Sequence, residues 1–294
     1  MFGVLNCHKP IGVTSRDVVN VVQRRMRPVK VGHAGTLDPL ATGVLLVPVG
    51  PAVRLTSYLQ ELPKRYDAVF QLGVETASGD LEDEPLPLAD APIPNASQVE
   101  SAARQLIGRI EQVPPAHSAI KVGGQRAYKL VRRGETVAMP ARTVDIHGID
   151  VVEYQYPRLR LKIECGSGTY VRTIGSDLAK LCDTVAVMAS LVRTAIGGFT
   201  LEAAHPLDAL RTEPLEPMLC SPLLAVPNLP HVTVSDPIMQ RIQHGQVVAL
   251  PGEALAAVAP DTSQIAAVDS EQRFRALLVP RDGGWRAHRC FPLP

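Results

Sequence analysis

The sequence predicts an α+β protein with a large N-terminal domain and a small β-rich C-terminal one. Short Val- and Ile-rich runs alternate with amphipathic helical stretches along most of the chain. A proline-rich stretch at 212–230 has the composition of a linker. Beyond it, short runs of alternating polarity indicate strands. Because 294 residues are enough for two unequal domains, we expect one at 1–225 and the other at 232–294.

Three stretches have the apolar spacing of amphipathic helices. Ser15 is the expected N-cap of the first, and Asn95 or Ser97 of the second. The inward faces should include Ile107 in the second helix and Leu181 in the third. The predicted helices span 15–26, 97–110 and 173–182.

Strands are expected where apolar and polar residues alternate. In the N-terminal domain these runs lie at 66–74, 144–152 and 159–165. In the C-terminal domain they lie at 231–234, 247–250, 265–268, 273–279 and 285–288. Two further segments look like excursions from the core: the acidic, Pro-rich 81–95, predicted to be a mobile surface loop, and a basic insertion at about 114–141.

The net charge of +1 hides an uneven distribution. Residues 1–35 carry six basic side chains against one acidic, and residues 121–142 again carry six against one. Residues 71–100 carry seven acidic side chains and no Lys or Arg. Two basic segments suit a polyanion such as RNA, although either segment alone is equally compatible with ordinary solvated surface.

The five cysteines are scattered, with no C-x-x-C pair. This favours reduced thiols in a cytoplasm over a disulfide framework or a zinc site. The N-terminus lacks the basic and apolar regions of a signal peptide, and no apolar run is long enough to span a bilayer. We therefore expect a cytoplasmic protein.

One acidic residue, Asp38, stands out on physical grounds. It lies in a glycine-rich segment and precedes Pro39, which keeps its backbone away from the helical region. A carboxylate on a stiff turn beside a buried strand suits a pre-organised catalytic group. However, Asp followed by Pro is equally typical of a helix N-cap or a simple turn, and on this segment alone that interpretation is favoured.

The motif around Asp38 changes that weighting. His33-Ala34-Gly35-Thr36-Leu37-Asp38-Pro39-Leu40-Ala41-Thr42-Gly43-Val44-Leu45 closely resembles the catalytic motif of the tRNA pseudouridine-55 synthase (TruB) family. The resemblance continues in the family's order along the chain. It includes Lys9-Pro10, Lys64-Arg65-Tyr66, Pro114-Pro115, Gly168-Thr169-Tyr170-Val171-Arg172 and Leu191 with Arg193-Thr194.

The resemblance implies a pseudouridine-synthase core built on a mixed, mostly antiparallel sheet, and an RNA-gripping insertion at 114–141. It also implies a PUA-like RNA-binding domain at 232–294, by position alone. Asp38 matches the catalytic aspartate, which attacks C6 of uracil or C1′ of ribose, or assists glycosidic cleavage. Arg172 matches an arginine that pairs with this aspartate and keeps it ionised; a structural ion pair elsewhere is the alternative.

Other matched residues are expected to bind the substrate. Tyr66 matches a tyrosine that stacks on the target base and helps to remove its C5 proton, since a flipped base needs an aromatic face. Tyr170 and Leu191 match residues of the uracil pocket, and His33 matches a histidine that fills the space the base leaves. Lys64 is expected to contact a phosphate or to stabilise the motif. Each of these side chains could instead serve only in packing.

The implied reaction is isomerisation of the T-loop uridine at tRNA position 55, with the base flipped into the cleft. It involves no redox change or group donor, so no cofactor or metal is implied. The expected partner is the tRNA T-arm, with no protein partner and a monomeric enzyme. Three alternatives stay open: the same chemistry inside a guide-RNA particle, a non-catalytic RNA chaperone, and hydrolytic release of the base.

Overall fold

The computed structural model describes the chain except for residues 77, 82–83, 116–120, 123–124, 127–129, 131–132, 134–138, 257 and 292–294. Its main sheet runs in the order β13-β1-β2-β11-β3-β10-β9-β6, with β12 beside β11 and β14 beside β1. Its strands are β1 (Gly3–Lys9), β2 (Thr42–Val49), β3 (Lys64–Leu72), β6 (Gly108–Gln112), β9 (Arg142–Gln155), β10 (Arg158–Cys165), β11 (Ala186–Ile196), β12 (Phe199–Thr200), β13 (His205–Pro206) and β14 (Leu219–Cys220).

The predicted mixed, mostly antiparallel sheet is confirmed. Among the pairings within this sheet that the structure describes, β1 with β13 and β2 with β11 are parallel, and the others are antiparallel. Small hairpins β4 (Val74–Glu75) with β5 (Leu86–Pro87) and β7 (Lys121–Val122) with β8 (Gln125–Arg126) stand apart from it. The parallel contact of β2 with β11 matters most, because it joins the strand after Asp38 to the centre of the sheet.

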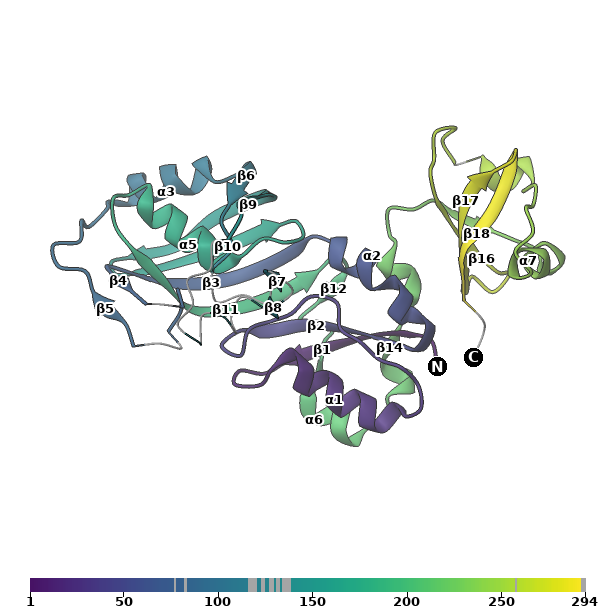
Figure 1. Ribbon diagram of the computed structural model, residues 1–294, viewed down its shortest axis with the longest axis horizontal. Helices are drawn as coiled ribbons and strands as arrows, with labels where there is room; N and C mark the ends of the chain where they lie inside the picture. Colours follow the sequence, from purple (N-terminus) through teal and green to yellow (C-terminus); the bar gives the residue numbers. More distant parts are fainter. Residues whose placement is uncertain are drawn as a thin grey trace.

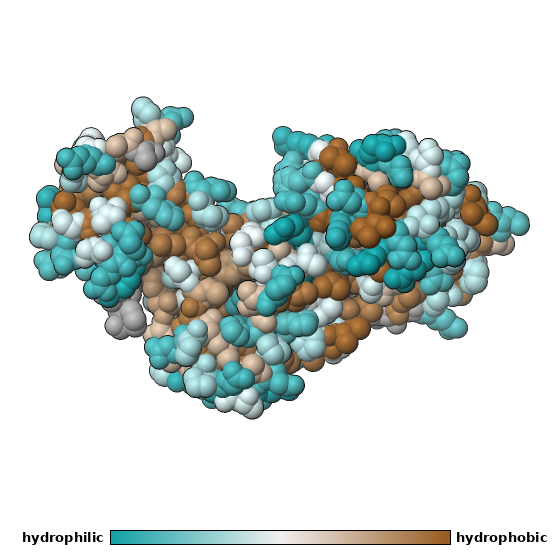
Figure 2. All heavy atoms as spheres, turned by 180° about the vertical axis from the view of Figure 1, so that it is seen from behind, coloured by the Kyte–Doolittle hydropathy of each residue, from teal (hydrophilic) through white to brown (hydrophobic). Residues whose placement is uncertain are grey.

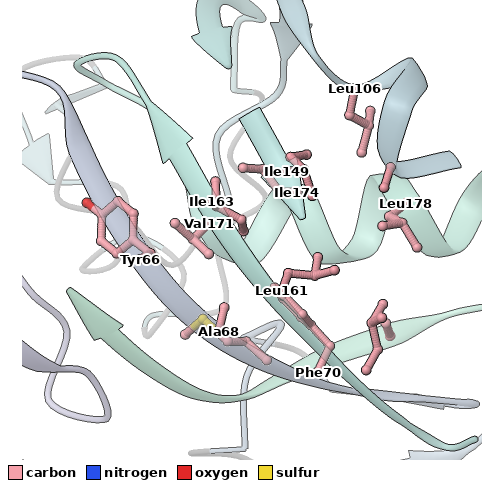
Figure 3. Close-up of a cluster of buried hydrophobic side chains, with 14 of the residues drawn as sticks. Tyr66, Ala68, Phe70, Leu106, Ile149, Leu161, Ile163, Val171, Ile174 and Leu178 are labelled. Carbon is pink, nitrogen blue, oxygen red and sulfur yellow. The ribbon is translucent and has the colours of Figure 1, made fainter. Parts of the chain in front are cut away.

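Helices cover the sheet in two groups (Figure 1). α3 (Ala96–Gln105) and α5 (Val171–Lys180) pack on the half formed by β3, β10, β9 and β6, over a buried cluster that includes Phe70, Leu161 and Ile174. Figure 3 shows this cluster, with Tyr66 at its end on the same strand as Ala68 and Phe70. α1 (Ser15–Met26) and α6 (Leu207–Thr212) cover β1 and β2. α2 (Thr56–Glu61) and the 3-10 turn η1 (Gly50–Leu55) connect β2 to β3.

The predicted helices occur, with corrections at their ends. The N-cap of α1 is Thr14 and not Ser15: the Thr14 side chain accepts from the amide of Asp17 in a capping box. α3 is shorter than predicted because its helical pattern runs into strand β6, and Ile107 is 41% exposed. Leu181 was also wrongly placed on an inward face, since it follows the last residue of α5 and is 47% exposed.

The proline-rich stretch at 212–230 is not a free linker. β14 pairs with β1, and two 3-10 turns, η2 (Glu216–Met218) and η3 (Pro222–Ala225), bury Met218 and Ala225. Proline fits such turns because its fixed φ suits their first positions. The stretch therefore belongs to the packed core.

The C-terminal part forms its own four-stranded sheet. It contains β15 (His231–Thr233), β16 (Ile265–Val268), β17 (Phe274–Arg281) and β18 (Gly284–Cys290), in that order, with α7 (Asp236–Gln243) and the turn η4 (Gly252–Leu255). Four of the five predicted runs are strands. The run at 247–250 is only an isolated bridge from Val248 to Trp285, and α7 was not predicted.

Aromatic stacking joins this C-terminal unit to the main sheet. The Phe2 ring stacks on Phe291 at 5.1 Å, and Phe291 stacks on Phe274 at 4.9 Å. The Arg54 guanidinium lies 4.7 Å from the Phe291 ring and also donates to the Cys290 carbonyl. Figure 2, a view from behind, shows apolar side chains where the two parts meet. The C-terminal unit is thus fixed to the core by an apolar contact.

Candidate functional site

Asp38 lies in a turn and not at a helix N-terminus. Its carbonyl accepts from the amide of Ala41 at 3.1 Å, and β2 begins directly afterwards at Thr42. The helix-cap alternative is therefore excluded, while the turn is confirmed. The Asp38 side chain is 42% exposed, more than its apolar neighbours suggest, because the turn carries it out of the core.

The backbone on both sides of Asp38 is held by buried polar side chains. The Ser15 hydroxyl accepts from the Leu37 amide at 2.8 Å and donates to the Leu37 carbonyl at 3.1 Å. The Lys9 ammonium is fully buried and donates to the Pro39 carbonyl at 3.4 Å, while the Gly12 amide donates to the same carbonyl at 2.9 Å. Since each backbone group is satisfied from a packed element, the turn is pre-organised.

Arg193 holds the other end of the same loop. It is only 2% exposed and donates from Nε to the Val44 carbonyl at 2.7 Å. Its Nη2 and Nη1 donate to the carbonyls of Gly35 and Thr36 at 3.2 and 3.4 Å. Glycine is required at position 43, where a Cβ would lie 2.2 Å from the Arg193 carbonyl and where φ is +109°.

Arg172 connects the loop to a second acidic residue. Its Nη2 lies 3.1 Å from Asp38 Oδ2, and its Nη1 lies 3.1 Å from Asp80 Oδ2. Nη1 also donates to the Ser78 carbonyl at 3.0 Å, and the Ser78 hydroxyl donates to Asp80 Oδ1 at 2.9 Å. Because Asp80 is 2% exposed and Arg172 is 8% exposed, the guanidinium is fixed from behind and directed at Asp38.

Tyr66 and Lys64 project from the same face of β3. Burial raises the pKa of the Tyr66 phenol above its usual value, an effect that the nearby Arg193 partly offsets. Burial, together with repulsion by Arg193, lowers the pKa of Lys64 to about 8. The Lys64 ammonium donates to the Gln60 carbonyl. The Tyr66 phenol is thus un-ionised at neutral pH, and the Lys64 ammonium loses its proton more readily than that of an exposed lysine.

Tyr170 is fixed by a buried amide. The Gln112 side chain accepts from the Tyr170 amide at 2.7 Å and donates to the Tyr170 carbonyl at 3.1 Å. Gln112 is fully buried at the end of β6. Because Tyr170 immediately precedes α5, this contact also fixes the start of the helix that carries Arg172.

These residues surround one cavity of about 320 Å³. Six of the seven residues predicted as the site line it: Asp38, Lys64, Tyr66, Tyr170, Arg172 and Leu191. The seventh, His33, lies on the same loop, is partly buried and does not line the cavity. The predicted insertion, 114–141, falls largely outside the described residues.

Sequence reasoning missed two residues of this site. Arg193 belongs to a quoted motif, so its type and position were visible, but its hydrogen bonds to the Asp38 loop were not. Asp80 was hidden among the seven acids of 71–100. Nothing in composition separates it from the others, because only the fold shows that it lies behind Arg172.

Comparison with known proteins identifies the family. The family model described as "TruB family pseudouridylate synthase (N terminal domain)" matches residues 23–171, which include the Asp38 loop and end beside Arg172. The chain belongs to this family. The tRNA pseudouridine synthase B of Trichormus variabilis is 41% identical over 265 residues, covering 88% of this chain and 89% of that protein.

Two further TruB-family relatives show the same similarity, one over the full chain and one over a shorter part at higher identity. The tRNA pseudouridine synthase B of Dehalococcoides mccartyi is 37% identical over 299 residues, covering 100% of this chain and 98% of that one. That of Rhodopirellula baltica is 49% identical over 206 residues, which is 68% of this chain and 59% of its relative. The family resemblance noted in the sequence is therefore confirmed.

Solved structures support the fold. A crystal structure of a Cbf5-Nop10-Gar1 complex contains a chain that aligns with a TM-score of 0.73 and 23% identity, over 98% of this chain and 84% of that one. A chain in the structure of an H/ACA RNP bound to a substrate RNA aligns with a TM-score of 0.71 and 20% identity, over 99% of this chain and 86% of that one.

In the part of the chain that the structure describes, no helix is long and apolar enough to cross a membrane.

Proposed function

We propose that this TruB-family protein converts the T-loop uridine at tRNA position 55 to pseudouridine, with Asp38 as the catalytic residue. The ion pair between Asp38 and Arg172, 3.1 Å across and open to a cavity beside Tyr66, carries this proposal. It places an oriented carboxylate where a flipped base would enter. The names of the curated relatives, all tRNA pseudouridine synthase B, support tRNA as the substrate.

The reaction breaks the bond from uracil N1 to ribose C1′ and forms a bond from C5 to C1′, while the C5 proton is lost and N1 gains one. No electrons enter or leave. The 42% exposed Asp38 carboxylate faces the cavity, so it can attack C6 or C1′, or stabilise an electron-poor C1′ during cleavage. Arg172 orients the carboxylate in each case, through the contact from its Nη2 to Asp38 Oδ2.

Tyr66, Leu191 and Tyr170 form the proposed uracil pocket. The Tyr66 ring offers a face for the flipped base. Because its pKa is raised, the phenol stays protonated and serves better as a contact than as the base that removes the C5 proton. Leu191 lies at the same wall, as the partner of Ala68 across β11 and β3.

His33 and Lys64 have supporting roles in this proposal. His33 lies outside the cavity but on the Asp38 loop, which suits a side chain that fills the gap left in the RNA stack. Lys64 lines the cavity, and its pKa is lowered to about 8. It stabilises the loop or contacts the ribose-phosphate backbone.

The domain organisation is also proposed. Residues 1–225 would form the catalytic domain with its RNA-gripping insertion at 114–141, and residues 232–294 would form a PUA-like domain that reads a distal part of the tRNA by shape. The fixed contact through Phe2, Phe274 and Phe291 supports a C-terminal unit held at constant distance from the cavity. We expect the enzyme to act as a cytoplasmic monomer.

The test is to incubate the purified chain with a bare T-arm hairpin and to map modified uridines. The proposal predicts one pseudouridine, at the position equivalent to 55, without any guide RNA or other protein. A requirement for a guide RNA would support the particle alternative. Free uracil in the products would show hydrolysis, and bound but unmodified hairpin would show a chaperone; either would contradict the proposal.

A further inference from the structure

The cavity carries a surplus of positive charge. Four cationic side chains line it, namely Lys64, Arg142, Arg172 and Arg193, against one carboxylate, Asp38, among the described lining residues. Uracil and ribose are neutral, so neither accounts for this surplus. In RNA, the negative charge lies on the phosphodiester groups, and one of these flanks each side of a flipped nucleotide.

Three of the four cations are already engaged with the protein. Arg172 pairs with two carboxylates, Arg193 donates to three backbone carbonyls, and Lys64 donates to one. All three are at most 8% exposed. Arg172 and Arg193 are therefore committed to holding the Asp38 loop, and Lys64 has little exposed surface. Arg142 is partly exposed, which makes it the best placed of the four to bind an external anion.

Arg142 has a geometry suited to that task. Its guanidinium carbon lies 4.7 Å from the centroid of the Tyr170 ring, and its buried Nε has no hydrogen-bond partner among the residues described. Gly168 lies against the guanidinium, where a Cβ would be 3.6 Å from it. Stacking fixes the plane of a guanidinium and leaves its edge available for bidentate binding of phosphate.

We infer that Arg142 binds a backbone phosphate of the RNA beside the flipped nucleotide. Arg142 pairs across β9 and β6 with Gln112, whose amide holds the Tyr170 backbone. A phosphate bound at Arg142 would therefore lie at a fixed position relative to Tyr170. The inference deepens the proposed function and rests on it.

The test combines protein variants with RNA hairpins that each carry one neutral methylphosphonate, at a linkage flanking the target uridine. Binding is measured in the Asp38→Asn protein to prevent turnover. We expect one linkage whose neutralisation weakens binding about tenfold. Arg142→Gln should weaken binding of the unmodified hairpin by a similar factor, with no further loss at that linkage. It should also reduce the salt slope by about 0.7.

Two comparisons make the result specific. Arg109→Gln removes an exposed charge from β6, outside the cavity. This variant should bind the unmodified hairpin within about twofold of the affinity of the protein with Arg109 intact, and it should still lose affinity when the sensitive linkage is neutralised. Arg142→Lys keeps the charge but not the planar fork, so its affinity should fall between that of the protein with Arg142 intact and that of Arg142→Gln. Thermal unfolding of each variant identifies any loss of folded protein.

The inference is overturned if, at every linkage, Arg142→Gln and the methylphosphonate weaken binding independently, so that the combined loss of affinity equals the product of the two separate losses. It is also overturned if Arg142→Gln slows the reaction while affinity and salt slope stay unchanged, since Arg142 would then only support Tyr170. Failure of the proposed function is distinguishable, because the wild-type protein would then leave the unmodified hairpin without pseudouridine.

Discussion

Replacing Asp80 by Asn tests whether the second carboxylate behind Arg172 sustains the reaction. Asp80 is 2% exposed and lies 3.1 Å from Arg172. Coulomb's law gives about 5 kcal/mol at that separation for an effective dielectric constant of about 20. Because desolvation offsets much of this and Arg172 keeps Asp38 as a partner, we expect a loss of about 3 kcal/mol in the free energy of unfolding.

The same change should slow catalysis more than it affects binding. Asp80 does not line the cavity, so KM should stay within about threefold. Arg172 would lose one of the two carboxylates that it contacts among the described residues, and would hold Asp38 less firmly. A loss of about 1.4 to 2 kcal/mol in transition-state stabilisation corresponds to a 10- to 30-fold lower kcat. Single-turnover pseudouridine formation and urea unfolding measure the two effects.

Asp67→Asn is the matched control. Asp67 pairs with Arg160 at 2.7 Å on the other face of β3, and the two side chains are 17% and 40% exposed. Removing this more exposed pair should cost at most about 1 kcal/mol and leave kcat unchanged. If Asp80→Asn lowers kcat no more than Asp67→Asn does, Asp80 does not act on the reaction through Arg172.

Further changes test the surroundings of the site. Arg193→Lys should lose about 2 kcal/mol of unfolding free energy and at least tenfold in kcat, because the guanidinium reaches the three carbonyls through three separate nitrogens and a single ammonium nitrogen cannot reach all of them; unchanged values would show that these hydrogen bonds do not hold the loop. Gly43→Ala should unfold at a lower temperature, since its Cβ would lie 2.2 Å from a carbonyl oxygen; an unchanged Tm would show that the loop adapts. Lys64→Met should raise stability by about 2 kcal/mol below pH 8, because the folded state disfavours the ammonium. As pH rises from 8 to about 10.5, the ammonium deprotonates in both states and this gain should vanish, so a gain independent of pH would contradict the assignment. Burial acts to raise the pKa of Asp269, but hydrogen bonds from Arg273 and Arg275 lower it to about 2. Above pH 4 the ionised Asp269 should therefore contribute about 1 to 2 kcal/mol to the free energy of unfolding. This contribution should be lost as pH falls towards 2, and it should be absent in Asp269→Asn.

Local sequence patterns predicted much of the fold because they reflect local physics. The helix at 15–26 and the strands at 144–152 and 159–165 follow directly from hydrophobic periodicity. Periodicity failed where one pattern continued into another element: the helix pattern at 97–110 overlaps the first residues of β6. It also could not show that the proline-rich stretch packs on β1, because that depends on tertiary contact.

The site was predictable where a motif names the residue, and not where tertiary contact alone supplies it. Six of seven predicted side chains line one cavity. Ser15 was interpreted as a helix cap, yet its hydroxyl bonds to Leu37 beside Asp38. Asp80 lies 42 residues beyond Asp38, directly before the segment 81–95 whose composition indicates a surface loop. Only the fold brings it behind Arg172.

Comparing wild-type protein with Asp38→Asn on the same T-arm hairpin tests most directly whether Asp38 is the catalytic residue. Pseudouridine at the target position and hairpin affinity are measured together. We expect the variant to form no detectable pseudouridine but to bind the hairpin within about threefold of the wild-type affinity, since Asp38 contributes no positive charge. Pseudouridine formation by the variant at near the wild-type rate would contradict the claim that Asp38 is the catalytic carboxylate.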